Sequence, residues 1–187
     1  MNDASPHRGN LRPHPLAEQL ARRLRGRMGA SVLEIGSGSR RNRDALEAAG
    51  FYVTAFEPRP THGSTFDAAL STHGLLHGTH ETIAAQLQDI AALLKTGAPL
   101  YATFASIADQ RWGKGVRVAP DVYAAQTGDE AGVPHAFFDQ ARLSALLDEH
   151  FAIESIREVN VADIVGTWAH AEPPRGSVHF FVIAVRR

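Results

Sequence analysis

The stretch that decides the fold is residues 32–42, VLEIGSGSRRN. An apolar run over 31–35 enters two glycines, Gly36 and Gly38, and a helical pattern follows over 42–49. Glycine adopts backbone conformations that other residues avoid, and it lets a ligand approach the main chain closely. This order of residues therefore predicts a buried strand, a tight turn and a helix whose amino terminus faces a ligand.

The arginines after the glycines narrow the choice of ligand. A dinucleotide-binding fingerprint would have a third glycine where Arg41 stands, which weakens the alternative of a nicotinamide dehydrogenase. Arg40, Arg41 and Arg43 crowd the positive end of the helix dipole, so an anion is needed to compensate. An amino-acid carboxylate is a suitable anion.

A second signal follows about 20 residues after the glycines. Residues 51–56 are expected to form the next strand, and Glu57 stands at its carboxyl end. An acidic side chain at this place can accept hydrogen bonds from ribose hydroxyls. Together the glycine turn and Glu57 predict a nucleoside-containing ligand.

The rest of the chain alternates between strand and helix patterns. Helices are expected from Pro15, from a cap at Thr79 and from a cap at Asp139, and strands over 66–70, 99–104, 151–161 and 178–185. Residues 107–134 show no clear period and are interpreted as a long loop over a site. This order predicts an α/β fold: a Rossmann-like, mostly parallel sheet with helices on both faces and an antiparallel last pair of strands.

Composition restricts the class of partner. The chain has 187 residues, a formal net charge of -1 and no cysteine, so disulfides and thiolate zinc ligands are excluded. Nothing predicts nucleic-acid binding or a membrane span. We expect a flexible amino-terminal segment over 1–13, a single domain over 14–187 and a cytoplasmic location.

Three segments resemble class I S-adenosylmethionine-dependent methyltransferases. VLEIGSGSRRN and YVTAFEP are similar to the first two motifs of that family, and FDAALSTHGLLHGT is similar to the fourth. The later segments ATFAS, DQRWGKG, GDEAGVPHAFF and RGSVHFFVIAVRR resemble a bacterial subgroup related to tellurite-resistance and ubiquinone-type methyltransferases. The resemblance covers nearly everything after residue 30.

The resemblance implies S-adenosylmethionine as cofactor and a small-molecule methyl acceptor. It places cofactor contacts at the glycine turn, at the ribose-binding acid and at the fourth motif: Glu34, Gly36, Ser37, Gly38, Arg41, Asn42, Glu57, Ser71 and Thr72. His73 and His77 lie beside the expected methyl position. Histidine suits a general base because its ordinary pKa leaves much of it neutral near pH 7. Packing is an equal alternative for His77, and substrate contact is favoured for His73.

The acceptor pocket is expected under the 107–138 segment and the last strands. Its candidate residues are aromatic or polar: Arg111, Trp112, His135, Trp168 and His170. Exposed tryptophans also anchor protein interfaces, so a homodimer contact is an alternative for Trp112 and Trp168.

The histidines at 73, 77 and 80 raise the question of a metal site. Gly74 and Gly78 indicate a loop here, and Glu81 is the only nearby carboxylate that could take part. We therefore expect no metal site.

One departure from the family affects the cofactor site. Only residues 58–65 separate Glu57 from the next strand, fewer than a parallel crossover usually takes. The sheet is therefore expected to lack the edge strand that normally follows the ribose-binding acid. This leaves a degenerate, non-catalytic relative that acts as a partner subunit or scaffold as the alternative to an active methyltransferase.

Overall fold

A computed structural model describes residues 12–36, 38–56, 65–168 and 175–187. The central strands are β1 (Ser31–Ile35), β2 (Tyr52–Ala55), β3 (Ala68–Ser71) and β4 (Pro99–Ser106), all parallel in the order β2-β1-β3-β4. The last strands, β8 (Phe151–Asn160) and β9 (Val178–Arg186), pair antiparallel, and β9 pairs antiparallel with β4. The predicted Rossmann-like sheet is therefore confirmed.

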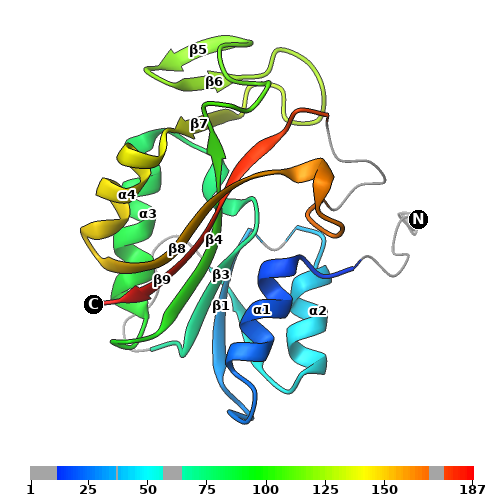
Figure 1. Cartoon of the computed structure of the whole chain (residues 1–187), viewed down its shortest axis with the longest axis vertical. Coiled ribbons are helices and arrows are strands. Elements are labelled where there is room, and N and C mark those ends of the chain that lie inside the picture. The colour runs from blue at the N-terminus through cyan, green and yellow to red at the C-terminus, as the bar shows by residue number, and fades with distance from the viewer. Residues whose placement is uncertain (1–11, 37, 57–64, 169–174) are drawn as a thin grey trace, which may run out of the picture.

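Helices cover both faces of this sheet (Figure 1). α1 (Pro15–Arg23) and α2 (Arg41–Ala48) lie on one face, and α3 (His80–Leu93) and α4 (Gln140–Asp148) lie on the other. Neighbouring residues of a strand contribute to opposite cores: Val32 of β1 packs with α1 and α2, whereas Leu33 packs with α3. This two-sided burial explains why the central strands are continuous apolar runs.

The helices begin where capping residues stand in the sequence. Thr79 Oγ1 accepts a hydrogen bond from Thr82 N at 3.2 Å, and Asp139 Oδ1 accepts one from Arg142 N at 2.7 Å. Pro15 occupies the first turn of α1, where its missing N–H costs no hydrogen bond. All three predicted helix starts are confirmed.

Among the described residues the sheet ends at β2, while residues 57–64, which follow it, lie outside the described part of the chain. In the described part of the chain, β2 pairs only with β1, and the next paired strand in the sequence is β3. The expected absence of the edge strand therefore stays a prediction.

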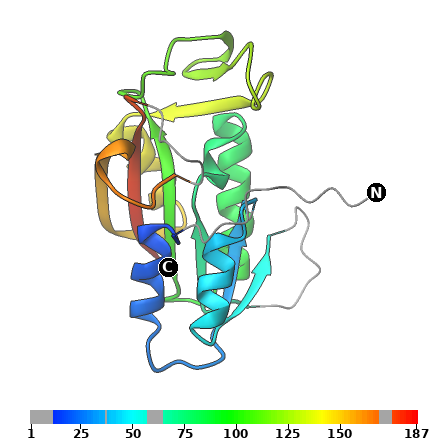
Figure 2. The same ribbon diagram turned by 90° about the vertical axis from the view of Figure 1, so that its right-hand side faces the viewer.

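The segment interpreted as a loop contains strands. β5 (Val116–Ala119), β6 (Val122–Ala124) and β7 (Pro134–Phe138) form an antiparallel meander, and β7 pairs in parallel with the carboxyl end of β4. The loop prediction was wrong because β5 and β6 are too short to show a period, and a tight turn at Asp121, with a φ of 53°, joins them. Figure 2 shows this meander at one end of the molecule, beyond the central sheet.

Two short 3-10 turns complete the described elements. η1 (Gly74–Leu76) follows β3, and η2 (Val161–Asp163) follows β8. None of the helices in the described ranges is both long and apolar enough to cross a bilayer.

Candidate functional site

The carboxyl ends of β1 and β3 meet at one edge of the sheet, where ligands bind in open α/β folds. Gly36 leaves β1 with a φ of 77°, and a Cβ added there would lie 2.6 Å from Gly74 Cα. A Cβ on Gly74 would in turn lie 2.6 Å from Ile35 O. The two glycines therefore let the turns after β1 and β3 touch, and Gly36 serves the fold whether or not a ligand binds.

Two features beside the glycine turn bear on cofactor binding: the space next to Gly38 and the buried carboxylate of Glu34. A Cβ on Gly38 would meet no described atom within 4 Å, so this part of the turn borders open space. Glu34 is 3% exposed, and its Oε2 is buried without a hydrogen-bond partner among the described residues. Burial raises the pKa of Glu34, and the nearby Arg43 and Arg40 oppose that shift. An open turn beside an unsatisfied buried carboxylate fits the amino-acid end of S-adenosylmethionine.

A chain of hydrogen bonds links the other predicted cofactor residues to the protein itself. Asn42 Nδ2 donates to Thr72 Oγ1 at 2.7 Å, and Asn42 Oδ1 accepts from His14 N at 2.8 Å. Ser71 Oγ accepts from Leu75 N at 3.1 Å and so begins the η1 turn. These side chains shape the edge of the site, and their contact with a cofactor stays a prediction.

Arg41 is buried and binds backbone rather than open space. Its guanidinium donates to the carbonyl oxygens of Arg12, 3.1 Å away, and of the turn at 166–168, at 2.6–3.2 Å. The side chain thus fastens the segment before α1 and the segment after η2 to the glycine turn. The predicted contact of Arg41 with the cofactor stays untested, and sequence reasoning did not foresee this anchoring.

His73 lies in a cluster of aromatic rings. Its ring centroid is 5.0 Å from Trp168, 5.4 Å from His179 and 5.9 Å from His14. Burial, followed by the neighbouring His179 and His14, holds the pKa of His73 well below its ordinary value. His73 is therefore neutral near pH 7 and a weak proton acceptor.

The two flanking histidines each have one ring nitrogen that contacts the protein. His14 Nδ1 accepts from Leu16 N, so the proton of the neutral ring is on Nε2. His179 Nε2 lies 3.2 Å from the Nη2 donor of Arg111 and 3.3 Å from Ser177 Oγ. The other nitrogens, His14 Nε2 and His179 Nδ1, are buried without a partner among the described residues. Burial lowers the pKa of His14 to about 3 and of His179 to about 4.

The carboxylate of Asp109 fixes the position of Arg111. It accepts hydrogen bonds from Arg111 Nε at 3.0 Å and from Arg111 Nη2 at 3.2 Å, and a third from Ser177 Oγ at 2.8 Å. The carboxylate is fully buried, so these contacts are what permit its charge there. The network connects the end of β4 to the start of β9 and aims Arg111 at the adjoining cavity.

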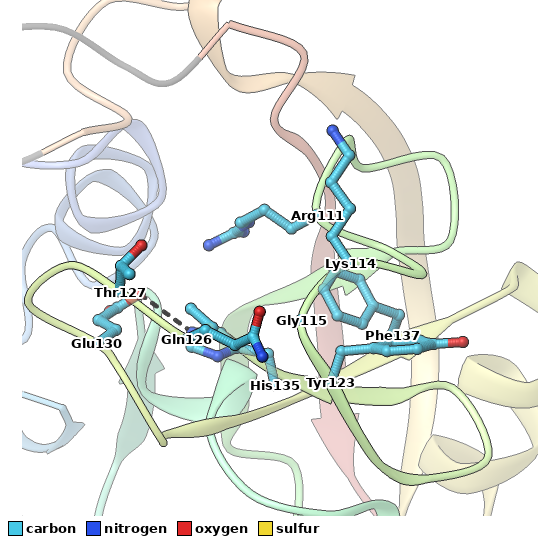
Figure 3. A pocket seen from close by; sticks show the side chains of 10 residues that line it. Arg111, Lys114, Gly115, Tyr123, Gln126, Thr127, Glu130, His135 and Phe137 are labelled. Atoms are coloured by element: carbon cyan, nitrogen blue, oxygen red, sulfur yellow. Dashed lines mark ion pairs between the residues drawn. The ribbon is translucent and has the colours of Figure 1, made fainter.

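A cavity of about 280 Å³ lies between the meander and residues 111–115, which follow β4. Among its lining residues are Arg111 and His135, two of the predicted substrate residues, together with Tyr123, Glu130 and Phe137 (Figure 3). Trp112, also predicted, does not line it: its indole donates to Asp121 at 3.1 Å and packs edge-on against Tyr123. Trp168 contacts His73 instead.

His77 and His135 come together with a carboxylate beside this cavity. His77 Nε2 lies 3.3 Å from Glu130 Oε1, and His135 Nε2 lies 3.2 Å from Glu130 Oε2. The two imidazole rings are perpendicular, with centroids 4.8 Å apart. His135 and His77 hold the pKa of Glu130 well below its ordinary value, so the carboxylate is charged near pH 7.

The remaining predicted site residues either lie outside the described part of the chain or point into the core. Ser37, Glu57 and His170 lie outside the described residues. His80, considered as a metal ligand with His73 and His77, turns into the core, where its Nε2 lies 3.0 Å from Phe137 O. Sequence reasoning missed His14, Glu130 and His179: His14 precedes every motif, and the family-like segments that contain Glu130 and His179 do not show what these side chains contact. The alternating sequence pattern of the β9 segment predicts that His179 is buried, but it does not predict which residues the ring contacts.

The fold defined by this sheet and edge is that of class I S-adenosylmethionine-dependent methyltransferases. The chain is similar to 1,6-didemethyltoxoflavin-N1-methyltransferase of Burkholderia thailandensis, solved with its substrate and S-adenosylhomocysteine, at a TM-score of 0.66 and 21% identity over 92% of this chain and 76% of that one. It is also similar to magnesium protoporphyrin IX methyltransferase of Synechocystis with bound S-adenosylmethionine (TM-score 0.57, 16% identity, 91% and 78% covered).

A third similar structure is TehB of Haemophilus influenzae, at a TM-score of 0.59 and 13% identity over 93% of this chain and 62% of that one. No family model and no curated protein sequence matches the chain. At these identities the likeness establishes the fold, and the activity has to be argued from the site.

Proposed function

We propose that the protein transfers a methyl group from S-adenosylmethionine to a small-molecule acceptor. The observation that carries this proposal is the buried, unsatisfied Glu34 Oε2 beside the open turn at Gly38, at the carboxyl edge of a methyltransferase fold. The similar structures from Burkholderia and Synechocystis hold S-adenosylhomocysteine or S-adenosylmethionine. The bound cofactor would supply an activated methyl group on a sulfonium.

The chain's own residues would bind and orient the two reactants. Glu34 would receive the ammonium of the methionine end, and Gly38 would allow close approach of the backbone. Glu57 would hold the ribose. Methyl transfer depends mainly on alignment, so a fixed wall of His73, His14 and Trp168 suits the reaction.

The acceptor would enter through the cavity below the meander. Its walls combine Phe137 and Tyr123 with the charged groups of Arg111 and Lys114. An aromatic wall with a few polar groups suits a small organic molecule. Where the acceptor arrives protonated, His77 is the candidate base because it is half-exposed and oriented by Glu130.

The second candidate is a degenerate, non-catalytic relative that acts as a partner subunit or scaffold. It is favoured by the described part of the sheet, in which β2 is the last strand at its edge, and Tyr52 on β2 and Met28 beside it are exposed. A second copy that packs against this edge would cover these two side chains, so a homodimer belongs to the proposal. Light scattering on the purified protein measures that state.

The test is methyl transfer itself. The full-length protein is incubated with methyl-deuterated S-adenosylmethionine and a panel of small acids, phenols and heterocycles, and products are detected by mass spectrometry. Labelled product with one equivalent of S-adenosylhomocysteine supports the proposal, and its loss in Glu34→Gln ties the activity to this site. Failure to bind either form of the cofactor favours the degenerate alternative.

A further inference from the structure

The cluster of His77, Glu130 and His135 has a feature that hydrogen bonding between the three residues does not explain. His135 Nδ1 lies 3.0 Å from the carbonyl oxygen of Val133, which can only accept, so the ring's proton is on Nδ1. The Nε2 lone pair of the neutral ring then faces Glu130 Oε2, another acceptor, at 3.2 Å. Two acceptors at this distance repel unless a cation stands between them.

The backbone fixes the two histidines before any cation binds. His77 and His135 form an antiparallel bridge, and Gly78 N donates to Pro134 O at 2.8 Å beside it. Residues opposite each other in such a bridge direct their side chains to the same side. His77 follows β3 and His135 lies on β7, so the bridge also joins the fourth motif to the meander.

The third group reaches the histidines from the loop between β6 and β7. Glu130 lies in a turn closed by hydrogen bonds from Val133 N to Glu130 O at 3.1 Å and from Gly132 N to Ala125 O at 2.8 Å. Its carboxylate offers one oxygen to each imidazole, and the ligand atoms of all three residues lie within 4.8 Å of one another.

We propose that His77, Glu130 and His135 bind a divalent transition-metal ion, with Zn²⁺ the best match. Tetrahedral zinc with bonds of 2.0–2.2 Å keeps its ligand atoms about 3.3 Å apart. Each imidazole nitrogen lies 3.2 or 3.3 Å from a different oxygen of Glu130, so a small turn of this half-exposed carboxylate would let one oxygen face both nitrogens. Two imidazoles and one carboxylate are ligands that zinc and iron(II) both accept. The bond from His135 Nδ1 to a backbone carbonyl is the usual outer contact of a metal-bound histidine.

Three protein ligands leave coordination positions open. Glu130 and His135 line the cavity, so an open position borders the space proposed for the acceptor (Figure 3). The nearby cations do not prevent binding: Arg111 is paired with Asp109, and the ammonium of Lys114 points away from Glu130 and His135. An acceptor with a hydroxyl or carboxylate oxygen could complete the coordination.

The metal site goes beyond the proposed function and changes one part of it. A metal-bound His77 has no free lone pair on Nε2 and cannot serve as a base. A metal ion instead lowers the pKa of an oxygen bound to it, which performs the same task. The two roles of His77 exclude each other, so metal binding decides between them.

The test uses the untagged full-length protein and metal ions alone, without the methyl donor. Zinc binding is measured by calorimetry, and cobalt(II) is added as a probe whose visible absorption intensifies in a tetrahedral site. The expected result is one equivalent of zinc per chain with micromolar or tighter affinity, and an intense cobalt spectrum. Because no cofactor is present, failure of methyl transfer does not affect this result.

Two matched pairs of variants locate the site. Glu130→Gln removes the charge of a half-exposed side chain and leaves the fold intact, and we expect zinc affinity to fall at least about 100-fold. Glu149→Gln, at the end of α4, is its control. His77→Ala is compared in the same way with His150→Ala, and both controls should bind like the unaltered protein.

Equal zinc affinity in Glu130→Gln and the unaltered protein would overturn the proposal, as would a weak, octahedral cobalt spectrum. Absence of binding would also overturn it, and a proton on His135 Nε2 would then be the cation that separates the two acceptors.

Discussion

At the scale of single residues, the two glycines of the turn have different roles that their spacing in the sequence does not reveal. Gly36 has a positive φ and touches Gly74, whereas Gly38 has room for a side chain and no such φ. Packing requires the first to be glycine, whereas no contact among the described residues requires it of the second.

Substitution of Gly36 and of Gly38 gives a prediction that separates an effect on folding from an effect on ligand binding. Gly36→Ala should lower the free energy of unfolding by roughly 2 kcal/mol or more, because its Cβ meets backbone that cannot move aside. Gly38→Ala should keep the melting temperature of the unaltered protein and weaken S-adenosylhomocysteine binding at least about tenfold. Thermal denaturation and calorimetry measure the two effects. Unchanged binding in Gly38→Ala would mean that no ligand approaches this turn.

Asp67 gives a prediction on the opposite edge of the sheet. Lys95, followed by the backbone and hydroxyl of Ser31, lowers the pKa of Asp67 to about 2, and Arg27 also contacts it. A carboxylate with a depressed folded pKa stabilises the fold above its unfolded pKa near 4, and this contribution disappears as the pH falls to about 2.

Asp67→Asn should therefore cost about 1–2 kcal/mol at pH 7, a value reduced for solvent screening because both cations are exposed. Urea denaturation at pH 7 and at pH 2.5 measures the difference between the two proteins. We expect the gap to shrink at the lower pH, and a gap that does not change with pH would exclude the ion pairs as its cause.

At the scale of elements, α2 is connected to segments distant in the sequence through Arg41. The side chain binds carbonyl oxygens from the segment before α1 and from the turn after η2. A sequence motif predicts a charged residue near a ligand, but it contains no information about which backbone the long side chain will meet. The anchoring role could therefore be found only in the fold.

Replacing Arg41 should loosen both segments at once. Arg41→Ala leaves buried carbonyl oxygens without donors, and we expect a loss of about 2–4 kcal/mol in unfolding free energy. Hydrogen exchange should rise around residues 12–14 and 164–168. The matched control is Arg40→Ala, whose side chain makes an exposed ion pair with Asp44 at 3.6 Å and no other polar contact within the described ranges. Equal protection in both variants would contradict the anchoring role.

The elements also show what the sequence could and could not predict. The apolar runs, the capping residues and the glycine turn predicted the parallel sheet and the helix starts. The meander was missed because its strands are short and carry no periodic pattern. The cluster at His77 was missed because Glu130 lies 53 positions away, and only the meander brings it there.

At the scale of the whole molecule, three buried histidines make stability depend on pH. His14, His73 and His179 have folded pKa values below the ordinary 6.5 because burial disfavours their charged forms. Below pH 6.5 the unfolded chain binds protons that the folded protein does not, so the free energy of unfolding decreases as the pH is lowered. The window runs from pH 6.5 down to about 4 for His179 and about 3 for His14.

Each such histidine removes up to about 1.4 kcal/mol of stability per pH unit within this window. Urea denaturation at pH 7, 6 and 5 should therefore show a steep decline, and His179→Gln should show a shallower one. A free energy of unfolding that stays constant from pH 7 to pH 5 would mean that these rings are charged in the folded protein.

The central claim is that this edge of the sheet binds S-adenosylmethionine, and calorimetric titration with S-adenosylhomocysteine tests it most directly. The full-length protein should bind about one equivalent with micromolar affinity. Glu34→Gln and Glu57→Ala should each weaken binding at least about tenfold, the expected loss for a hydrogen bond to a charged group. Absence of binding at millimolar ligand, or equal affinity in all three proteins, would contradict the claim.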